Sequence, residues 1–175
     1  ATPGNYTVTL IVTSTIGCTD TVTQGVTVQP SPLAAFATDT VCLGDSTTFT
    51  DQSSILFGNI VTWEWDFGDG GTSTSQNPTH VFPDDTTYMV QLVVTSALGC
   101  KDTVLLEVFI HPQPEAAFTS SGACLIDGTQ FTDQSAVKAG SIVSWEWDFG
   151  DGGSDTVANP KHMYGSTGGQ SAQLI

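Results

Sequence analysis

Apolar and polar residues alternate along most of the chain, and this alternation predicts β-strands. Val61, Trp63, Trp65 and Phe67 fall on one face of the segment 60–67, whereas the residues between them are polar or acidic. Side chains of a strand point alternately to opposite faces, so the pattern is typical of a half-buried strand. The strands expected in the middle of the chain, bounded by Gly, Pro, Asp or Asn, are 33–38, 46–51, 60–67, 71–75, 79–82, 87–95 and 102–110.

The chain also repeats itself. The octapeptide WEWDFGDG begins at residue 63 and again at residue 145, a spacing of 82 residues, and no insertion or deletion breaks this register. A fixed period of this length indicates a repeated structural unit rather than a duplicated catalytic peptide. The expected division is the C-terminal part of one repeat at 1–30, a complete repeat at 31–112 and the N-terminal part of a further repeat at 113–175.

Short strands separated by turns predict an all-β fold of antiparallel β-sandwiches, which the repeat places in a head-to-tail array. The GDGG segment at 68–71 is expected to form the turn after the strand at 60–67, because glycine readily adopts positive φ and aspartate accepts hydrogen bonds from nearby amides. The expected core aromatics are Trp63, Trp65, Phe67, Tyr88, Trp145, Trp147 and Phe149.

The octapeptide, followed by NPTHVF at 77–82 and YMVQLVV at 88–94, resembles the polycystic-kidney-disease (PKD) domain, an immunoglobulin-like β-sandwich. YTVTLIV at 6–12 and NPKHMY at 159–164 resemble the same family. The resemblance implies domains that occur in tandem on secreted and cell-surface proteins as spacers, adhesive modules or appendages of hydrolases. The GCTDTV and GCKDTV hairpins also resemble long repeat proteins secreted by Bacteroidota, including gliding-type adhesins.

One aromatic position distinguishes the copies. Tyr6 and Tyr88 stand where sandwiches of this type place a tyrosine corner, in which a buried ring ties its strand to the preceding turn through the hydroxyl. Gln170 occupies this position in the third copy, so that copy is expected to be weaker.

The charge excludes several classes of partner. Lys and Arg number 3 against 18 Asp and Glu, a formal net charge of −15, which disfavours binding to nucleic acids and to anionic membrane surfaces. No apolar run approaches the ~18 residues of a membrane span, and residues 1–30 lack the pattern of a signal peptide. The acidic residues are expected to keep a surface-exposed array soluble.

Catalytic groups are not apparent. His80 and His162 are expected on equivalent strands with their ring nitrogens hydrogen-bonded, and His111 in a linker. Glu64 and Asp66 share a face and imitate a glycosidase pair, but that face is expected to be open sheet surface. We therefore expect no enzymatic activity.

Calcium is the metal that this composition allows, because it takes six to eight oxygen ligands from carboxylates and carbonyls. None of the acidic residues falls in a D-x-D-x-D-G loop, so turn capping is the competing interpretation and no cofactor is expected. The weak calcium candidates are Asp39, Asp45, Asp66, Asp69, Asp84 and Asp85.

Two cysteines per repeat, Cys42 and Cys124 early and Cys18 and Cys100 late, indicate an oxidising compartment and disulfides. An intradomain Cys42–Cys100 bond is disfavoured, because eight-residue strands of ~27 Å separate ends that a disulfide must bring to ~5.5 Å. The favoured pairing joins repeats, with Cys42 bonded to the late cysteine of the third repeat, beyond residue 175. Free or inter-chain thiols remain the other alternative.

A recurring triplet, Asp followed by Ser or Thr and then a small aliphatic residue or Thr, resembles the O-glycosylation motif of Bacteroidota secreted proteins, although a chain rich in Thr and Asp generates such triplets by chance. The candidate acceptors are Thr21, Thr40, Ser46, Thr86, Thr103 and Thr156.

These observations favour a non-catalytic extracellular or cell-surface protein whose tandem domains form a stalk, adhesin or filament. The alternative is an accessory substrate-binding or spacer module of a secreted hydrolase. A sugar-binding module needs an exposed aromatic strip, whereas nearly all aromatics here are expected to face inward. The expected partners are neighbouring repeats, other copies in a filament, or extracellular polysaccharide or protein.

Overall fold

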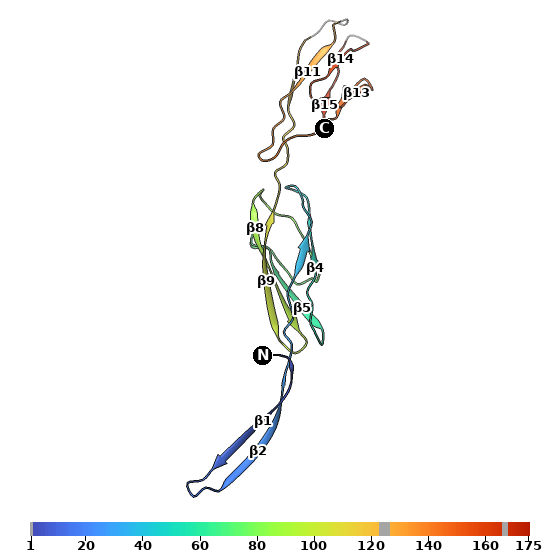
Figure 1. Cartoon of the computed structure of the whole chain (residues 1–175). Helices are drawn as coiled ribbons and strands as arrows, with labels where there is room; N and C mark the ends of the chain where they lie inside the picture. Colours follow the sequence, from blue (N-terminus) through green and yellow to red (C-terminus); the bar gives the residue numbers. More distant parts are fainter. Residues whose placement is uncertain (1, 123–126, 166–167) are drawn as a thin grey trace. The chain divides into compact units, whose positions relative to one another are not determined.

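The computed structural model describes residues 2–122, 127–165 and 168–175, and within these residues the regular elements are all β-strands (Figure 1). The chain forms two compact units, Ala1–Ile110 and His111–Ile175. This agrees with the all-β fold that the alternating pattern predicts.

A long hairpin precedes the complete repeat. Strand β1 (Gly4–Thr13) pairs antiparallel with β2 (Thr19–Val28) over its whole length, and all of β1 is exposed (Figure 1). The Tyr6 hydroxyl donates to the Thr2 carbonyl at 2.6 Å, as in a tyrosine corner, but the Tyr6 ring is 42% exposed rather than buried as predicted.

The complete repeat is a sandwich of two antiparallel sheets with the strand orders β3-β4-β7 and β6-β5-β8-β9. Each strand overlaps the range that the sequence predicts, although β3, β6 and β7 are two to three residues shorter than predicted. The strands are β3 (Phe36–Thr38), β4 (Thr47–Asp51), β5 (Ile60–Asp66), β6 (Thr72–Ser73), β7 (Thr79–His80), β8 (Thr87–Ser96) and β9 (Lys101–Phe109).

Aromatic rings fill the space between the two sheets. Trp65 from β5 meets Phe36 edge-on at a centroid distance of 5.1 Å and lies 5.4 Å from Phe49 of the facing sheet. Trp63 is half-buried and packs at the border of this core. The fully buried apolar residues of the repeat include Phe49, Trp65, Phe67, Phe82, Val90, Leu92, Val94, Val108 and Ile110.

One inward-facing assignment was wrong. Val61 is 50% exposed, whereas its neighbour Ile60 packs against the core. The pairing of β5 with β8 shifts between Ile60 and Thr62, which is the mark of a β-bulge. A bulge inserts one residue and moves the following side chains to the other face, so strict alternation fails at this point.

Tyr88 forms the tyrosine corner that its position predicts. Its ring is buried, and its hydroxyl accepts from the Asp84 amide at 3.2 Å and lies 3.4 Å from the Asp84 carbonyl. The Ile110 amide donates to the Thr86 carbonyl of the same turn at 3.0 Å. The start of β8 and the end of β9 are therefore tied to one turn.

The second unit repeats this arrangement with shorter strands, in sheets of order β10-β11-β14 and β13-β12-β15. Phe131, Trp147 and Phe149 are its buried aromatics, and Trp145 is half-buried like Trp63. Gln170 is exposed. The strands are β10 (Phe118–Ser120), β11 (Thr129–Asp133), β12 (Trp147–Asp148), β13 (Ser154–Asp155), β14 (Lys161–His162) and β15 (Gln173–Leu174).

Candidate functional site

The GDGG turn joins β5 to β6 and is held by the two aspartates of the octapeptide. Gly68 and Gly70 have φ of 81° and 93°, a region that favours glycine. Asp66 accepts from the Gly68 amide at 2.9 Å, and Asp69 accepts from the Gly71 amide at 2.8 Å. The carboxylates thus satisfy amides that the turn leaves without strand partners.

Asp69 also binds a histidine from the other sheet. Its second carboxylate oxygen lies 2.7 Å from Nε2 of His80 on β7, and the two side chains are 9% and 20% exposed. The His80 ring stacks on Phe67 at 4.1 Å with an interplanar angle of 8°. A Cβ at Gly71 would come within 2.6 Å of the His80 ring, which explains the second glycine of the GG pair.

The third copy reproduces this geometry. Asp151 lies 2.9 Å from Nε2 of His162 and accepts from the Gly153 amide at 2.9 Å. The His162 ring stacks on Phe149 at 4.1 Å. Sequence reasoning missed these two pairs, although the same separation of 11 residues between aspartate and histidine in both copies was the signal available.

The Asp–His pair acts as a clamp between the two sheets. Two members of a Ser-His-Asp triad are present, but the histidine nitrogen is bound to the carboxylate and the ring face is covered by Phe67, so the geometry favours a structural role. Glu64 is 55% exposed on the sheet surface and pairs with Lys101 at 3.6 Å. It lies on open sheet, as predicted, rather than in a cleft.

A second aspartate joins β4 to the loop before β7. One oxygen of Asp51 accepts from the indole N–H of Trp63 at 2.7 Å and from Gln76 at 3.0 Å, and the other accepts from the Ser53 amide at 2.9 Å. The Asp51 amide donates to the Asn77 side chain at 2.8 Å. The half-buried Trp63 therefore has its polar atom satisfied by a carboxylate.

The equivalent contacts recur around Asp133, which accepts from the indole N–H of Trp145 at 2.8 Å and from the Ser135 amide at 2.9 Å. Burial raises the pKa of Asp51, but hydrogen bonds from Ser53, Gln76 and Trp63 outweigh it and hold the pKa below its usual value. Hydrogen bonds from Ser135 likewise lower the pKa of Asp133.

These lowered pKa values predict loss of stability in acid. Burial raises the pKa of Asp69, but the hydrogen bonds from His80 and Gly71 outweigh burial and hold the pKa below its usual value. Asp69 and Asp51 are therefore both more acidic in the folded domain than in the unfolded chain. A depressed carboxyl pKa contributes stability above the unfolded value of about 3.9, and this contribution is lost as the pH falls through the folded pKa. The melting temperature should hold from pH 7 to about pH 5 and fall below about pH 4.

Asp51→Asn should weaken the acid response and cost about 1–2 kcal/mol at pH 7, because its amide group cannot accept all three hydrogen bonds. The matched control is Asp45→Asn on an exposed turn. Circular dichroism melts between pH 2.5 and pH 7 measure both effects, and equal losses in the two variants would contradict the role of Asp51.

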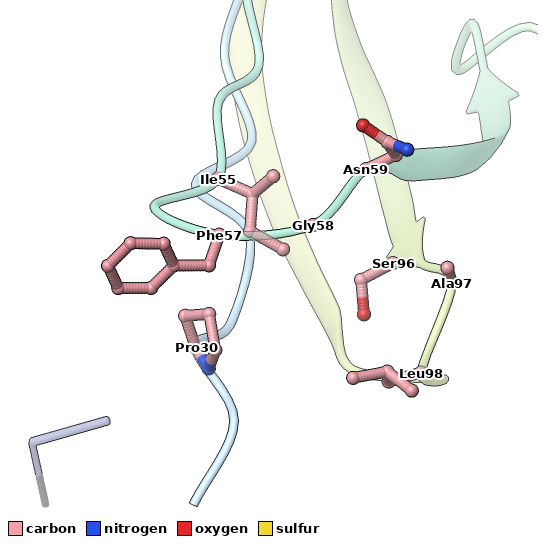
Figure 2. Close-up of a pocket in the computed structure, with 8 residues that line it drawn as sticks. All are labelled: Pro30, Ile55, Phe57, Gly58, Asn59, Ser96, Ala97 and Leu98. Atoms are coloured by element: carbon pink, nitrogen blue, oxygen red, sulfur yellow. The ribbon is translucent and has the colours of Figure 1, made fainter. Parts of the chain in front are cut away.

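A small hollow lies at the end of the complete repeat (Figure 2). Phe57 and Leu98 border it and are 70% and 68% exposed, so Phe57 is an exception to the expectation that nearly all aromatics face inward. The lining contains no acidic, basic or thiol side chain, which gives the hollow no catalytic chemistry. Its residues are Pro30, Ile55, Phe57, Gly58, Asn59, Ser96, Ala97 and Leu98.

The calcium candidates are spread over different turns. Asp39 accepts from the Thr48 amide at 2.8 Å, and Asp66 and Asp69 cap the GDGG turn. Asp45 and Asp84 lie exposed in loops, and Asp85 is half-buried. Across residues 2–122, 127–165 and 168–175, no group of three or more His, Cys, Asp or Glu side chains is placed to hold a metal ion.

A family model described as "PKD domain" matches residues 27–110 and 111–175. The chain belongs to the PKD-domain family. The two matched ranges follow one another directly, which agrees with the tandem PKD domains that the sequence resemblance implied.

Two curated relatives contain similar segments. Collagenase ColA of Bacillus cereus is 37% identical over 60 residues, which cover 34% of this chain and 6% of the collagenase. The pre-pro-metalloprotease PrtV of Vibrio cholerae is 33% identical over 114 residues, covering 62% of this chain and 12% of PrtV. The chain therefore spans only a small part of either relative's length.

Among solved structures, the PKD1 domain of the Vibrio cholerae metalloprotease PrtV is 36% identical, with a TM-score of 0.43, and the match covers 46% of this chain and 96% of that domain. The family model thus assigns both matched ranges of this chain to PKD domains. In the described residues, no helix is long and apolar enough to cross a membrane.

Three of the four cysteines lie in the part of the chain that the structure describes. Cys42 is exposed in the loop before β4, and Cys100 is half-buried in the β8–β9 hairpin, beside the loop that follows β4. The two therefore lie towards opposite ends of the sandwich, which agrees with the reason for disfavouring a bond between them. Cys18 is an exposed thiol in the β1–β2 hairpin, and Cys124 lies outside the described residues. Pairing between repeats stays a prediction.

The Asp-Ser/Thr triplets have structural roles as well as exposed hydroxyls. Asp102 accepts from the Ala34 amide at 2.8 Å and so ties β9 to the start of the domain. Asp155 accepts from the Thr156 amide at 2.7 Å. Every candidate acceptor is exposed, namely Thr21, Thr40, Ser46, Thr86, Thr103 and Thr156. Glycosylation of these residues stays a prediction.

Proposed function

We propose that the chain is a non-catalytic segment of an extracellular or cell-surface protein, in which tandem PKD domains act as a load-bearing spacer that holds other parts of the protein at a distance. The observation that carries the proposal is the ungapped period of 82 residues together with the same Asp–His clamp in both domains. The two copies share the internal clamp and the repeat length, which are the properties that a spacer needs.

The connections between repeats support this function. VQPSP at 28–32 and IHPQP at 110–114 are short and contain proline, and Pro30, Pro32 and Pro112 are buried. Proline restricts the backbone of the residue before it and favours extended, semi-rigid connections. The net charge of −15 suits a surface that stays soluble at high local density.

The second candidate is an accessory module of a secreted hydrolase, and the names of the relatives favour it. The curated proteins that share PKD segments with this chain include a collagenase and a metalloprotease. In such a protein the domains would hold a catalytic neighbour against its polymeric substrate. Glycosylation at the exposed threonines, assembly with other copies and adhesion to surfaces other than the polymeric substrate of a hydrolase belong to the first candidate. Neither candidate requires a resident cofactor.

Stretching the single chain by its ends tests the spacer function. Residues 27–110 should unfold in one discrete event with a length gain of roughly 25–30 nm, because a fully extended residue spans about 3.5 Å. Gradual extension without a discrete event would contradict a load-bearing role. Co-sedimentation with insoluble collagen, cellulose and chitin separates the candidates, since the spacer should stay in the supernatant, whereas saturable depletion would favour the accessory module.

A further inference from the structure

Strand β9 forms an open edge of the complete PKD domain. Within the ranges that the structure describes, the strand order β6-β5-β8-β9 gives β9 one partner, β8. At one end of this ladder the Ser96 amide donates to the Cys100 carbonyl at 2.8 Å. At the other end the Ile110 amide donates to the Thr86 carbonyl at 3.0 Å. Hydrogen-bonded pairs recur at every second residue, so the even-numbered residues of β9 bond to β8 and the odd-numbered residues direct their amide and carbonyl groups to the open edge.

The side chains along this edge include two exposed leucines and two opposite charges. Leu105 is 51% exposed on the outer face of the sheet, and Leu106 is 41% exposed on the inner face. Lys101 and Glu107 are exposed and share the outer face with Leu105, because alternate residues of a strand point to the same face. An open edge with exposed apolar side chains can pair with a strand of another chain.

We propose that β9 of the complete domain pairs antiparallel with β9 of a second copy of the same chain, about a two-fold axis at Val104. The β6-β5-β8-β9 sheets of the two copies then join into one continuous sheet. The odd-numbered residues of the two strands face one another across the axis and exchange main-chain hydrogen bonds. Both copies use the same surface, so the contact is isologous and closes the assembly as a dimer. The interface lies within the complete domain and does not depend on either function proposed above.

Charge selects this register among those that the edge permits. Lys101 and Glu107 lie at equal distances along the strand on either side of Val104, so an axis at Val104 places each lysine opposite the glutamate of the other copy. Opposite charges on directly paired strand residues are stabilising, whereas like charges are destabilising. An axis at Leu105 would place Lys101 opposite Phe109, and both ion pairs would be lost. The sequence of β9 is therefore complementary to itself in one register.

A lysine on an edge strand is also a common defence against pairing, because it brings an unmatched charge to the contact. Here Glu107 of the same strand supplies the matching charge. Lys101 is the only Lys or Arg of the complete repeat, and the equivalent residues of β2 are Thr19 and Gly25, so the first repeat lacks both charges. Lys101 lies 3.6 Å from Glu64, but both side chains are more than half exposed, so this ion pair contributes little and leaves the lysine able to reach a second carboxylate.

Pairing at this edge also removes apolar surface from water. On the outer face, Leu105 lies diagonally across from Leu105 of the other copy. On the inner face, the half-buried Val104 lies opposite Val104 of the other copy, and the exposed Leu106 lies beside this contact. Main-chain hydrogen bonds and the burial of these side chains supply the affinity, whereas the two ion pairs fix the register.

Sedimentation of the full chain tests this interface, because the average mass should rise with concentration toward that of a dimer. Lys101→Glu places like charges at both contacts, and so does Glu107→Lys, so each variant should dimerise on the order of tenfold more weakly than the parent chain. An equimolar mixture of the two variants should regain the association of the parent chain, since each reversed charge then meets an opposite one. Both residues are exposed, so neither variant should change the melting of the complete domain appreciably.

Asp45→Lys is the matched control, because it makes the same change of charge as Glu107→Lys but lies exposed in the loop before β4, in the other sheet. A smaller net charge favours association of this acidic chain, so the weakening expected of Glu107→Lys has the opposite sign to the effect of net charge. A parent chain that is monomeric at all concentrations, equal weakening by Asp45→Lys, or a mixture that associates no better than the single variants would overturn the proposal.

A disulfide trap locates the two-fold axis. In a chain whose native cysteines are replaced by serine, Val104→Cys should link two chains, because Val104 lies opposite its own copy in a pair without mutual hydrogen bonds, where Cα atoms are about 4.5 Å apart. Leu106→Cys is on the same face, but it lies about 13 Å along the strands from its own copy and should link poorly. Linkage at neither position, or stronger linkage at Leu106 than at Val104, would overturn the proposal.

Discussion

Replacing Trp65 with alanine should lower the free energy of unfolding of the complete PKD domain by about 3–5 kcal/mol. The ring is 2% exposed and contacts Phe36 and Phe49 of the facing sheet, so its removal leaves a cavity between the sheets. It also removes the indole N–H that donates to the Ser75 carbonyl at 2.8 Å. A loss of this size is a large share of the ~5–15 kcal/mol that stabilises a typical domain.

Urea unfolding of the full chain, followed by far-ultraviolet circular dichroism, measures this loss as a shift of the transition that belongs to the complete domain. Val61→Ala on the same strand is the control, because this exposed side chain should change stability by less than about 0.5 kcal/mol. Similar transitions in the two variants would refute the placement of Trp65 in the core.

Gly68→Ala should cost about 2–4 kcal/mol, from two separate sources. The residue has a φ of 81°, where an L-residue is strained by about 1–2 kcal/mol. A Cβ built at this position comes within 2.7 Å of the Met89 carbonyl oxygen, so β8 must also move, and overpacking of this kind costs about 1–3 kcal/mol.

Gly70→Ala isolates the first source. Its φ of 93° is similar, but a Cβ there meets nothing within 4 Å. Gly70→Ala should therefore lose only the conformational term of about 1–2 kcal/mol. Thermal melts of the two variants side by side give the difference. Equal destabilisation would mean that the contact with the Met89 carbonyl contributes nothing.

The strands and most of the core could be predicted from the sequence because both depend on the local alternation of apolar and polar residues. The repeat also shows the same alternation in equivalent segments 82 residues apart. Trp65, Phe67 and Tyr88 are buried where the period of two places them. Val61 is the exception, since a bulge depends on how β5 pairs with β8 rather than on the residues of β5 alone.

The polar contacts were harder to predict, because they join side chains brought together only by the packing of two sheets. Asp69 and His80 lie on different strands, and the residue pattern of neither strand indicates the other. The same holds for Asp51 and Trp63. Pairing of cysteines between repeats depends on how successive domains meet, which alternation does not encode.

The loop that borders the hollow has a consequence for how such arrays evolve. Residues 52–59 read QSSILFGN and the equivalent residues 134–141 read QSAVKAGS, so Leu56 and Phe57 are replaced by Lys138 and Ala139 while the neighbouring glycine and the GDGG turn are unchanged. The same fold therefore carries an apolar loop in one copy and a loop with a basic residue in the next. Unequal crossing-over between such copies would exchange these loops without changing the residues that form the fold. The binding properties of the surface could then change by recombination alone.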